Sequence, residues 1–298
     1  MTPQSILVLC TRRLGDVLLS TALVRSLKQA WPQAAIDVLA LKASAAVLEG
    51  NPDIRRVLLV PPKAGLRESL AAIGGWRRYD LALSTFVDDR PQMIAFCAAP
   101  QRANVVPGPE IAGSWWKRAL AQRQVISETP WIHMAEQFLR LADAVGAPRA
   151  PYVVPPQPAD TSNLDRLLGE GWRERPYAVV HPMPLYTYKA WTVDGWASVI
   201  EWLQARGLRV VLTGGPGEEE RNYVGALAAC CGGAPVNLAG QLRFAELTPV
   251  IGGSRVFIGP DTSVTHLAAS TGAPTVALFG PTPPVNWANA IANSMRAV

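Results

Sequence analysis

Short apolar runs alternate with segments of helical period along the chain, and this alternation occurs once in each half. In the first half the pattern predicts a helix at 17–30 and strands at 6–9, 36–41, 57–60 and 81–84. In the second half it predicts strands at 178–181, 209–213, 255–258 and 275–279, separated by helices at 191–205, 218–230, 244–251 and 265–270. Strands that alternate with helices favour parallel, doubly wound sheets. We therefore expect an α/β fold with one such sheet in each half.

The chain is long enough for two domains, and its prolines indicate where they meet. Its 298 residues exceed the usual size of a single hydrophobic core. Five prolines fall within residues 148–158, a density that excludes a helix or a central strand and is typical of a semi-rigid linker. We expect two Rossmann-like domains, residues 1–156 and 157–298, that face one another. Ligands should then bind in the cleft between them, at the carboxyl ends of the strands.

Composition and cysteine content indicate a globular cytoplasmic protein. Apolar residues make up 49% of the sequence and charged residues 17%, which excludes a disordered chain. The sequence predicts neither a membrane-spanning helix nor a secretory signal. The four cysteines have neither C-x-x-C spacing nor a nearby histidine. We expect them to be buried thiols and expect no bound metal.

The net charge of +5 is unevenly distributed along the chain. Residues 1–150 carry 18 Lys and Arg against 12 Asp and Glu, whereas residues 151–298 carry 10 against 11. The positive excess therefore lies in the first half, which predicts that this half meets an anionic partner. A nucleic acid, a membrane surface and a phosphorylated small molecule all fit that charge. No basic stripe with interleaved aromatic residues favours nucleic acid.

The segment 259–269 places polar residues between an apolar strand and a helix. Asp261, Thr262 and Ser263 follow the strand and open a helix of small residues. A helix N-terminus with free backbone amides and short hydroxyl groups is suited to bind an anion. The same residues would also serve as an ordinary helix cap. The strand 275–279 follows at once, so two successive strands bring polar turns to one edge of the sheet.

The turn after the first predicted strand carries a carboxylate and two guanidinium groups. Arg12, Arg13, Gly15 and Asp16 come just before or at the start of the first helix. At the cleft, Asp16 would act as a general base on an acceptor hydroxyl, and the two arginines would face anionic groups of the acceptor. A simple helix cap beside two solvated arginines is the alternative. The helix N-terminus is expected to lower the pKa of Asp16 and to keep it ionised.

Two further turns of the second half carry candidate ligand-binding residues. Lys189 is the only lysine of residues 151–298 and lies in the loop after the strand 178–181. Its ammonium group would suit a phosphate, although a solvated surface lysine is the alternative. The glycine-rich turn after the strand 209–213 does not match the dinucleotide-binding pattern, because Glu220 stands where that pattern needs a glycine. Its three glutamates would repel a phosphate, so this turn is expected to meet a ribose or base edge, or simply to cap a helix.

Other conspicuous side chains are expected to be structural. Trp191 is expected to pack as the first inward residue of its helix rather than to stack on a base. His133 is expected on a helix face. The segment 115–118, Trp-Trp-Lys-Arg, is interpreted as a partly packed loop, with a membrane-surface contact as the alternative.

Six motifs, taken in order, make the chain resemble the ADP-heptose:lipopolysaccharide heptosyltransferases, glycosyltransferase family 9, which have the GT-B fold. The motifs are Leu14-Gly15-Asp16-Val17-Leu18-Leu19, His181-Pro182 with Lys189-Ala190-Trp191, Val211-Leu212-Thr213-Gly214-Gly215-Pro216, Asn237-Leu238-Ala239-Gly240, Asp261-Thr262 with His266-Leu267-Ala268-Ala269, and Phe279-Gly280-Pro281-Thr282. Together they cover nearly the whole chain with the spacing of the family.

The resemblance implies an inverting transfer of a heptose from ADP-heptose to the inner core of lipopolysaccharide, at a Kdo sugar on lipid A or a previously added heptose. It implies that Asp16 is the catalytic base, with Arg12, Arg13 and Gly15 at the acceptor. The residues assigned to the donor and its diphosphate are Lys189, Thr187, Asp261, Thr262, Ser263 and His266. Among these, Asp261 is assigned to the sugar hydroxyls. Gly215 and Glu218 are assigned to the donor nucleoside, and no metal or other cofactor is expected.

The resemblance also gives each predicted domain a role. Residues 1–156 would bind the acceptor and residues 157–298 the nucleotide sugar. The anionic lipopolysaccharide acceptor, at the inner face of the cytoplasmic membrane, would be the partner of the basic first half. We therefore expect a cytoplasmic enzyme that is peripheral on that membrane. The acceptor sugar, the heptose epimer and the oligomeric state stay open.

The chain departs from the family pattern at a few positions. Ser263 and Met183 stand where family members commonly have glycine, and Cys10 stands where an arginine is often found. The chain also ends at Val298, so the second domain is expected to be shorter than in the family, through truncation or as a short variant. Ser263, Met183 and the short C-terminus keep one alternative open, a non-catalytic module that binds an ADP-sugar. A GT-B transferase with another acceptor, such as a protein hydroxyl, is a second alternative.

Overall fold

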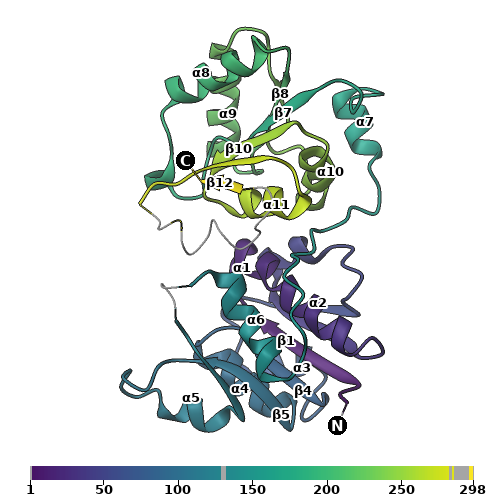
Figure 1. Cartoon of the computed structure of the whole chain (residues 1–298), viewed down its shortest axis with the longest axis vertical. Coiled ribbons are helices and arrows are strands. Elements are labelled where there is room, and N and C mark those ends of the chain that lie inside the picture. Colours follow the sequence, from purple (N-terminus) through teal and green to yellow (C-terminus); the bar gives the residue numbers. More distant parts are fainter. Residues whose placement is uncertain (1, 129–131, 282–283, 285–294, 298) are drawn as a thin grey trace. The chain divides into compact units, whose positions relative to one another are not determined.

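The computed structural model describes residues 2–128, 132–281, 284 and 295–297. The chain forms two compact units, Met1–Val154 and Pro155–Val298, and the boundary falls within the proline-rich segment. Figure 1 shows each unit as a sheet with helices packed around it. The expectation of two α/β domains, each with its own parallel sheet, is confirmed.

The N-terminal unit is built on six parallel strands in the order β3-β2-β1-β4-β5-β6. The strands are β1 (Ser5–Cys10), β2 (Ala35–Leu41), β3 (Arg56–Val60), β4 (Leu81–Ser84), β5 (Gln101–Val106) and β6 (Arg123–Ile126). The helices are α1 (Leu14–Leu19), α2 (Thr21–Ala30), the 3-10 helix η1 (Lys42–Leu48), α3 (Leu66–Ala72), α4 (Asp89–Ala98), α5 (Trp115–Leu120) and α6 (Met134–Ala144). The strand order reverses between β1 and β4, and a reversal of this kind opens a crevice at the carboxyl ends of the strands.

The C-terminal unit repeats this design with the strand order β12-β11-β10-β7-β8-β9. The strands are β7 (Tyr177–Val180), β8 (Arg209–Leu212), β9 (Val236–Asn237), β10 (Val256–Pro260), β11 (Thr275–Leu278) and β12 (Met295–Ala297). The helices are α7 (Ser162–Leu168), the 3-10 helix η2 (Thr187–Lys189), α8 (Val193–Gln204), α9 (Glu218–Cys230), the 3-10 helix η3 (Phe244–Glu246), α10 (Leu247–Gly252) and α11 (Ser263–Thr271). Here the order reverses between β7 and β10.

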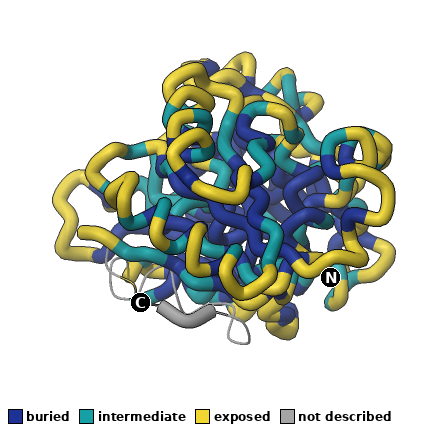
Figure 2. Tube along the Cα trace, turned by 90° about the horizontal axis from the view of Figure 1, so that it is seen from above, coloured by how far each residue is buried: buried dark blue, intermediate teal, exposed yellow. Residues whose placement is uncertain are grey.

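Continuous apolar runs explain why the central strands lie inside each unit. In β1, the side chains of residues 6–9 are fully buried, as expected for a strand covered on both faces by helices. In the C-terminal unit, Trp196 of α8 is fully buried and belongs to one core cluster with Val180 and Leu212. Figure 2 shows the buried positions gathered inside and the exposed positions on the surrounding helices and loops.

Two predicted helices are interrupted in the structure. The segment 17–30 forms α1 and α2 rather than one helix. The hydroxyl groups of Ser20 and Thr21 donate to the carbonyl oxygens of Val17 and Leu18 at 2.8 and 2.7 Å, and such bonds compete with the regular helix. The predicted helix after β9 similarly begins as η3 before it continues as α10.

Four smaller predictions are wrong. Trp191 precedes α8 and is 39% exposed, so it is not the first inward residue of that helix. His133 is the N-cap of α6 rather than part of a helix face, and its Nδ1 accepts the Ala135 amide at 3.0 Å. Trp115 and Trp116 begin the helix α5 instead of lying in a loop. Cys230 is exposed, whereas the other three cysteines are buried as predicted.

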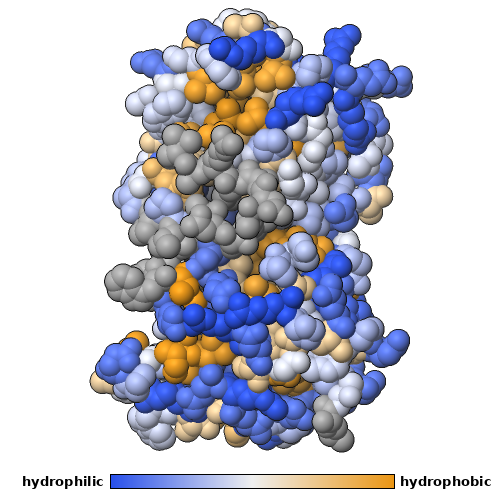
Figure 3. Space-filling model, in the orientation of Figure 1, coloured by the Kyte–Doolittle hydropathy of each residue, from blue (hydrophilic) through white to orange (hydrophobic). Residues whose placement is uncertain are grey.

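The surface of the N-terminal unit mixes hydrophilic side chains with small apolar patches, as Figure 3 shows for one face. Trp76, Ile111 and Trp115 are more than half exposed, at 57, 52 and 69%. In the part of the chain that the structure describes, no helix is both long and apolar enough to cross a membrane.

Candidate functional site

The polar residues that follow β1 lie at the carboxyl edge of the N-terminal sheet. Arg12 and Arg13 belong to the short connection between β1 and α1, and both are exposed. Gly15 and Asp16 lie in the first turn of α1, where Asp16 is only 7% exposed. The structure thus brings the four predicted residues to one edge, beside the crevice that the strand order opens.

The pKa of Asp16 is raised, so the prediction of a lowered pKa is wrong. Burial is the largest influence, because it disfavours the charged carboxylate. The Arg12 guanidinium and a hydrogen bond from the Arg13 backbone act in the opposite direction without offsetting it. Arg12 Nε is 3.9 Å from Asp16 Oδ2, too far for a hydrogen bond. A carboxylate with a raised pKa is a stronger base than one whose pKa is lowered by a helix N-terminus.

Arg12 is held in place by residues that sequence reasoning missed. Its guanidinium lies over the ring of Phe86, 4.7 Å from the centroid, and its Nη1 is 3.5 Å from Asp88 Oδ2. The Ser44 hydroxyl donates to the Arg12 carbonyl oxygen at 2.5 Å. Phe86 and Asp88 follow β4, which pairs with β1. The sequence signal for these residues is the short apolar strand β4 and the polar residues that follow it.

At the carboxyl edge of the C-terminal sheet, Lys189 and Asp261 form a largely buried ion pair. Lys189 Nζ lies 2.5 Å from Asp261 Oδ2 and 3.3 Å from the Asp261 carbonyl oxygen. The two side chains are 14 and 5% exposed. Lys189 comes from the loop after β7 and Asp261 from the end of β10, and these strands are neighbours at the point where the order reverses. The ion pair therefore joins the two sides of the crevice.

The N-terminus of α11 begins directly after this ion pair. Thr262 is the N-cap residue, and its carbonyl oxygen accepts the amides of Thr265 and His266 at 3.1 and 3.2 Å. The first two amides of the helix, those of Ser263 and Val264, have no carbonyl acceptor within their own helix. An ammonium group and helix-terminal amides thus lie within a few residues of one another, which is the combination that binds phosphate groups.

Two other predicted donor residues lie at the same edge but differ in burial. His266 lies in α11, with Nε2 3.9 Å from Asp261 Oδ1. Burial lowers the pKa of His266, so its imidazole is neutral at pH 7. Thr187 is exposed in η2, two residues before Lys189.

The turn after β8 brings in one acidic residue that was not selected as a site residue. Glu220 folds back over the turn, where a Cβ added to Gly215 would lie 2.6 Å from its Oε2. Burial raises the pKa of Glu220, and a hydrogen bond from the Gly215 backbone offsets only part of that effect. Glu220 Oε1 is 3.9 Å from Nε2 of the buried His181, whose pKa burial lowers to about 4. Glu218, the residue selected from the sequence, is exposed.

Within the described ranges, no group of three or more His, Cys, Asp or Glu side chains is arranged to hold a metal ion. The C-terminal turn at 280–282 is described only in part, because Thr282 of its predicted motif lies outside the described residues.

Two doubly wound domains, each with polar residues at the carboxyl edge of its sheet, place the chain among the α/β proteins that bind ligands at that edge. Within that class the chain belongs to glycosyltransferase family 9 (heptosyltransferase), whose model matches residues 103–298.

Relatives with assigned names agree with this membership. The chain is 30% identical over 288 residues to lipopolysaccharide heptosyltransferase 3 of Escherichia coli K12, covering 92% of this chain and 81% of the relative. Among solved structures, a family 9 glycosyltransferase from Veillonella parvula has a TM-score of 0.86 at 19% identity, covering 99% of this chain and 85% of the other. The ADP-heptose lipopolysaccharide heptosyltransferase II of E. coli has a TM-score of 0.77 at 22% identity, and the match covers 99% of this chain and 90% of the other. These structural likenesses show the fold, which is the GT-B architecture predicted from the sequence.

Proposed function

We propose that the protein transfers a heptose from ADP-heptose to an inner-core sugar of lipopolysaccharide, with inversion at the anomeric carbon. The observation that carries the proposal is the Lys189–Asp261 pair at the N-terminus of α11, in a chain that belongs to a heptosyltransferase family. The solved relative named for ADP-heptose supports the choice of donor.

The C-terminal unit would bind the donor. Its diphosphate would meet the ammonium of Lys189, the hydroxyls of Thr187 and Thr262, and the first amide of α11 at Ser263, since each of these groups lies at the same edge of the sheet. Asp261 and His266 would face the sugar. Gly215 and Glu218 would meet the nucleoside, and Glu220 now joins them because it folds over Gly215.

The N-terminal unit would bind the acceptor, and Asp16 would be the base. Its carboxylate would accept the proton of the acceptor hydroxyl while that oxygen forms its bond to the anomeric carbon. The bond from that carbon to the ADP oxygen would break on the opposite face, and ADP would leave with the electron pair. Lys189 and the helix amides would stabilise the charge that develops on ADP. Arg12, Arg13 and Gly15 would surround the acceptor, and no step needs a metal.

The acceptor also suggests where the protein works. A lipopolysaccharide precursor is anionic and is held in a membrane, and the basic excess of the chain lies in the N-terminal unit. Trp115 is 69% exposed on α5. We therefore place the enzyme in the cytoplasm, peripheral on the inner face of the cytoplasmic membrane.

The test is a transfer assay together with parallel calorimetric titrations. With ADP-heptose and Kdo-lipid A or heptosylated core acceptors, we expect heptosylated product and release of ADP. ADP should bind more tightly than GDP, UDP or NAD. Transfer to a protein hydroxyl alone would mean that the acceptor is a protein and not lipopolysaccharide. ADP binding without transfer to any acceptor would mean that the protein is a non-catalytic binding module. Tighter binding of UDP or NAD than of ADP would contradict the assignment of ADP-heptose as the donor.

A further inference from the structure

A second polar cavity lies in the N-terminal unit, at the end of the sheet opposite Asp16. Its volume is about 380 Å³, and it is bordered by the first residue of β1, Ser5, and by residues of the turns that precede β3 and β4. Since β1 is six residues long, about 20 Å separates the two ends of the strand. The cavity is therefore distinct from the proposed acceptor site.

Two arginines in this cavity are fixed by one buried carboxylate. Arg55 donates to Asp37 through Nε at 2.8 Å and Nη2 at 2.6 Å, and Arg56 donates through Nε at 3.3 Å and Nη2 at 2.7 Å. Tyr79 adds its hydroxyl at 2.8 Å. The Asp37 side chain is 0% exposed, whereas those of the two arginines are 46 and 58% exposed. Asp37 thus orients both guanidinium groups and leaves the rest of their N–H donors for a ligand.

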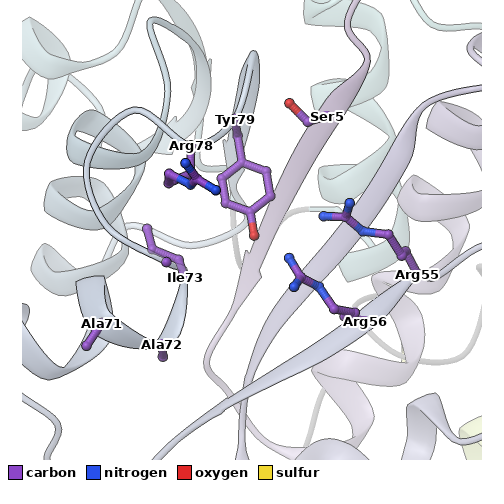
Figure 4. Close-up of a pocket in the computed structure, with 9 residues that line it drawn as sticks. Ser5, Arg55, Arg56, Ala71, Ala72, Ile73, Arg78 and Tyr79 are labelled. Atoms are coloured by element: carbon purple, nitrogen blue, oxygen red, sulfur yellow. The ribbon is translucent and has the colours of Figure 1, made fainter.

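A third guanidinium, that of Arg78, reaches the cavity from the other side of the Tyr79 ring. Figure 4 shows Arg78 on one side and Arg55 and Arg56 on the other. Within the part of the chain that the structure describes, no carboxylate lies within ion-pair distance of Arg78. The cavity lining therefore carries three guanidinium groups. Two carboxylates adjoin it, the buried Asp37 and Asp80, and Asp80 accepts from the Ser5 hydroxyl at 3.0 Å.

The remaining wall is apolar and does not repel an anion. It consists of Ala71, Ala72 and Ile73 at the end of α3. A helix C-terminus normally exposes carbonyl oxygens, but the amides of Gly74 and Gly75 donate to the last carbonyls of this helix at 3.1 and 2.8 Å. A ligand would find guanidinium groups on two sides and methyl groups on a third.

We propose that this cavity binds a phosphomonoester whose phosphate contacts the guanidinium groups of Arg55, Arg56 and Arg78. Guanidinium groups bind phosphate oxygens through paired hydrogen bonds. The cavity volume falls within the range of about 300–1,000 Å³ that small-molecule sites occupy, so the carbon-bearing part of the ester has room against the apolar wall. The site is separate from transfer chemistry, because it lies at the amino ends of the strands.

The experiment is calorimetric titration of the full chain with glucose 1-phosphate, inorganic phosphate and glucose, in saturating ADP to occupy the proposed donor site. We expect one glucose 1-phosphate per chain, weaker binding of inorganic phosphate and none of glucose. Arg78→Ala should weaken binding about 10- to 100-fold, the loss of a charge-assisted contact. Arg78→Lys should weaken it less. Arg67→Ala, which removes an exposed arginine of α3 outside the cavity, should change it less than twofold.

Several outcomes would overturn the proposal. The first is that the parent chain does not bind glucose 1-phosphate. The second is that Arg67→Ala and Arg78→Ala reduce its affinity equally. The third is that inorganic phosphate and glucose 1-phosphate bind with equal affinity. If Lys189→Ala abolishes binding and Arg78→Ala does not, the ester binds in the C-terminal unit and not in this cavity. Arg78 is exposed, so folding should survive its replacement. Arg78→Gln provides a second variant if the alanine chain is unstable. Arg55 and Arg56 are left intact, because removing either would leave the buried Asp37 less well paired.

Discussion

Asp16 lies in the first turn of a helix, yet it holds its proton more tightly than a free aspartic acid. The charged form is disfavoured because the side chain is buried, and neither Arg12 nor the hydrogen bond from the Arg13 backbone compensates for the lost hydration. Ionised Asp16 therefore destabilises the fold while it supplies a stronger base. Two measurements can separate these roles.

The first concerns turnover. Arg13 is the N-cap residue of α1, and the Asp16 side chain accepts a hydrogen bond from the Arg13 backbone. Asp16→Asn keeps the size of the side chain and an oxygen that can accept this bond, but it cannot accept the proton of the acceptor hydroxyl. We expect the rate of heptose transfer to fall by about 10²- to 10⁴-fold, the usual contribution of a general base. ADP affinity, measured by calorimetry as the control, should barely change. Turnover within a few-fold of the parent would mean that Asp16 is not the base and has only a structural role at the start of α1.

The second concerns stability against pH. The folded-state pKa of Asp16 lies above its unfolded value, so the folded chain binds more protons between the two and stability falls as pH rises through this window. Asparagine carries no charge and avoids that loss. We expect Asp16→Asn to melt at a higher temperature than the parent at pH 7. The difference should shrink as the pH falls below the unfolded pKa, and a lower melting temperature at pH 7 would contradict the assignment.

Residue-level surroundings were the part that the sequence predicted least well. The order of residues identifies Arg12 and Asp16, but Phe86 and Asp88 come near Arg12 only because β1 and β4 pair. In the same way, three consecutive glutamates open α9, and only the packed turn determines that Glu220 folds over Gly215. Burial and long-range contacts decide these details, and local spacing contains neither.

At the scale of elements, the loops after β7 and β10 are tied together by Lys189 and Asp261. The ammonium therefore serves two roles in the proposal, as partner of a buried carboxylate and as a ligand of the donor diphosphate. Because the carboxylate competes with the diphosphate for the ammonium, the two residues should respond differently to substitution.

We expect Lys189→Ala to weaken ADP binding by roughly 1.5–3 kcal/mol, the value of a hydrogen bond to a charged group. Asp261→Asn removes the competing charge and keeps the size of the side chain, so it should weaken ADP binding less. Calorimetry on both variants gives the comparison, and a melting curve checks that each is folded. An equal loss of ADP affinity in both would mean that the pair matters only as a structural link.

Secondary structure was well predicted where apolar runs are continuous. β4 and α9 match their predicted bounds, and most other strands differ by one or two residues at an end. The interruption at Ser20 was missed because it depends on hydroxyl groups that bond to the preceding turn. Strands such as β9, only two residues long, carry too little pattern to be recognised and form because neighbouring β8 offers a paired edge.

For the molecule as a whole, charge differs between the two units. The positive excess belongs to Met1–Val154, because residues 151–154 carry no charged side chain. The C-terminal unit is close to neutral, and the ammonium assigned to the donor is mostly buried in an ion pair. Exposed charges are screened by salt, whereas buried ones are screened much less. The two proposed substrates should therefore differ in how salt affects their binding.

We expect the affinity for the lipopolysaccharide acceptor to fall steeply as NaCl is raised, while the affinity for ADP changes little. Long-range attraction between the basic N-terminal unit and an anionic acceptor is lost once the screening length drops below about 10 Å, near 0.1 M salt. Arg12→Gln and Arg13→Gln together should make the acceptor response to salt shallower and leave the ADP response unchanged. Titrations of each ligand over a range of NaCl concentrations measure both slopes. Equal slopes for acceptor and donor would mean that the uneven charge of the chain has no part in substrate binding.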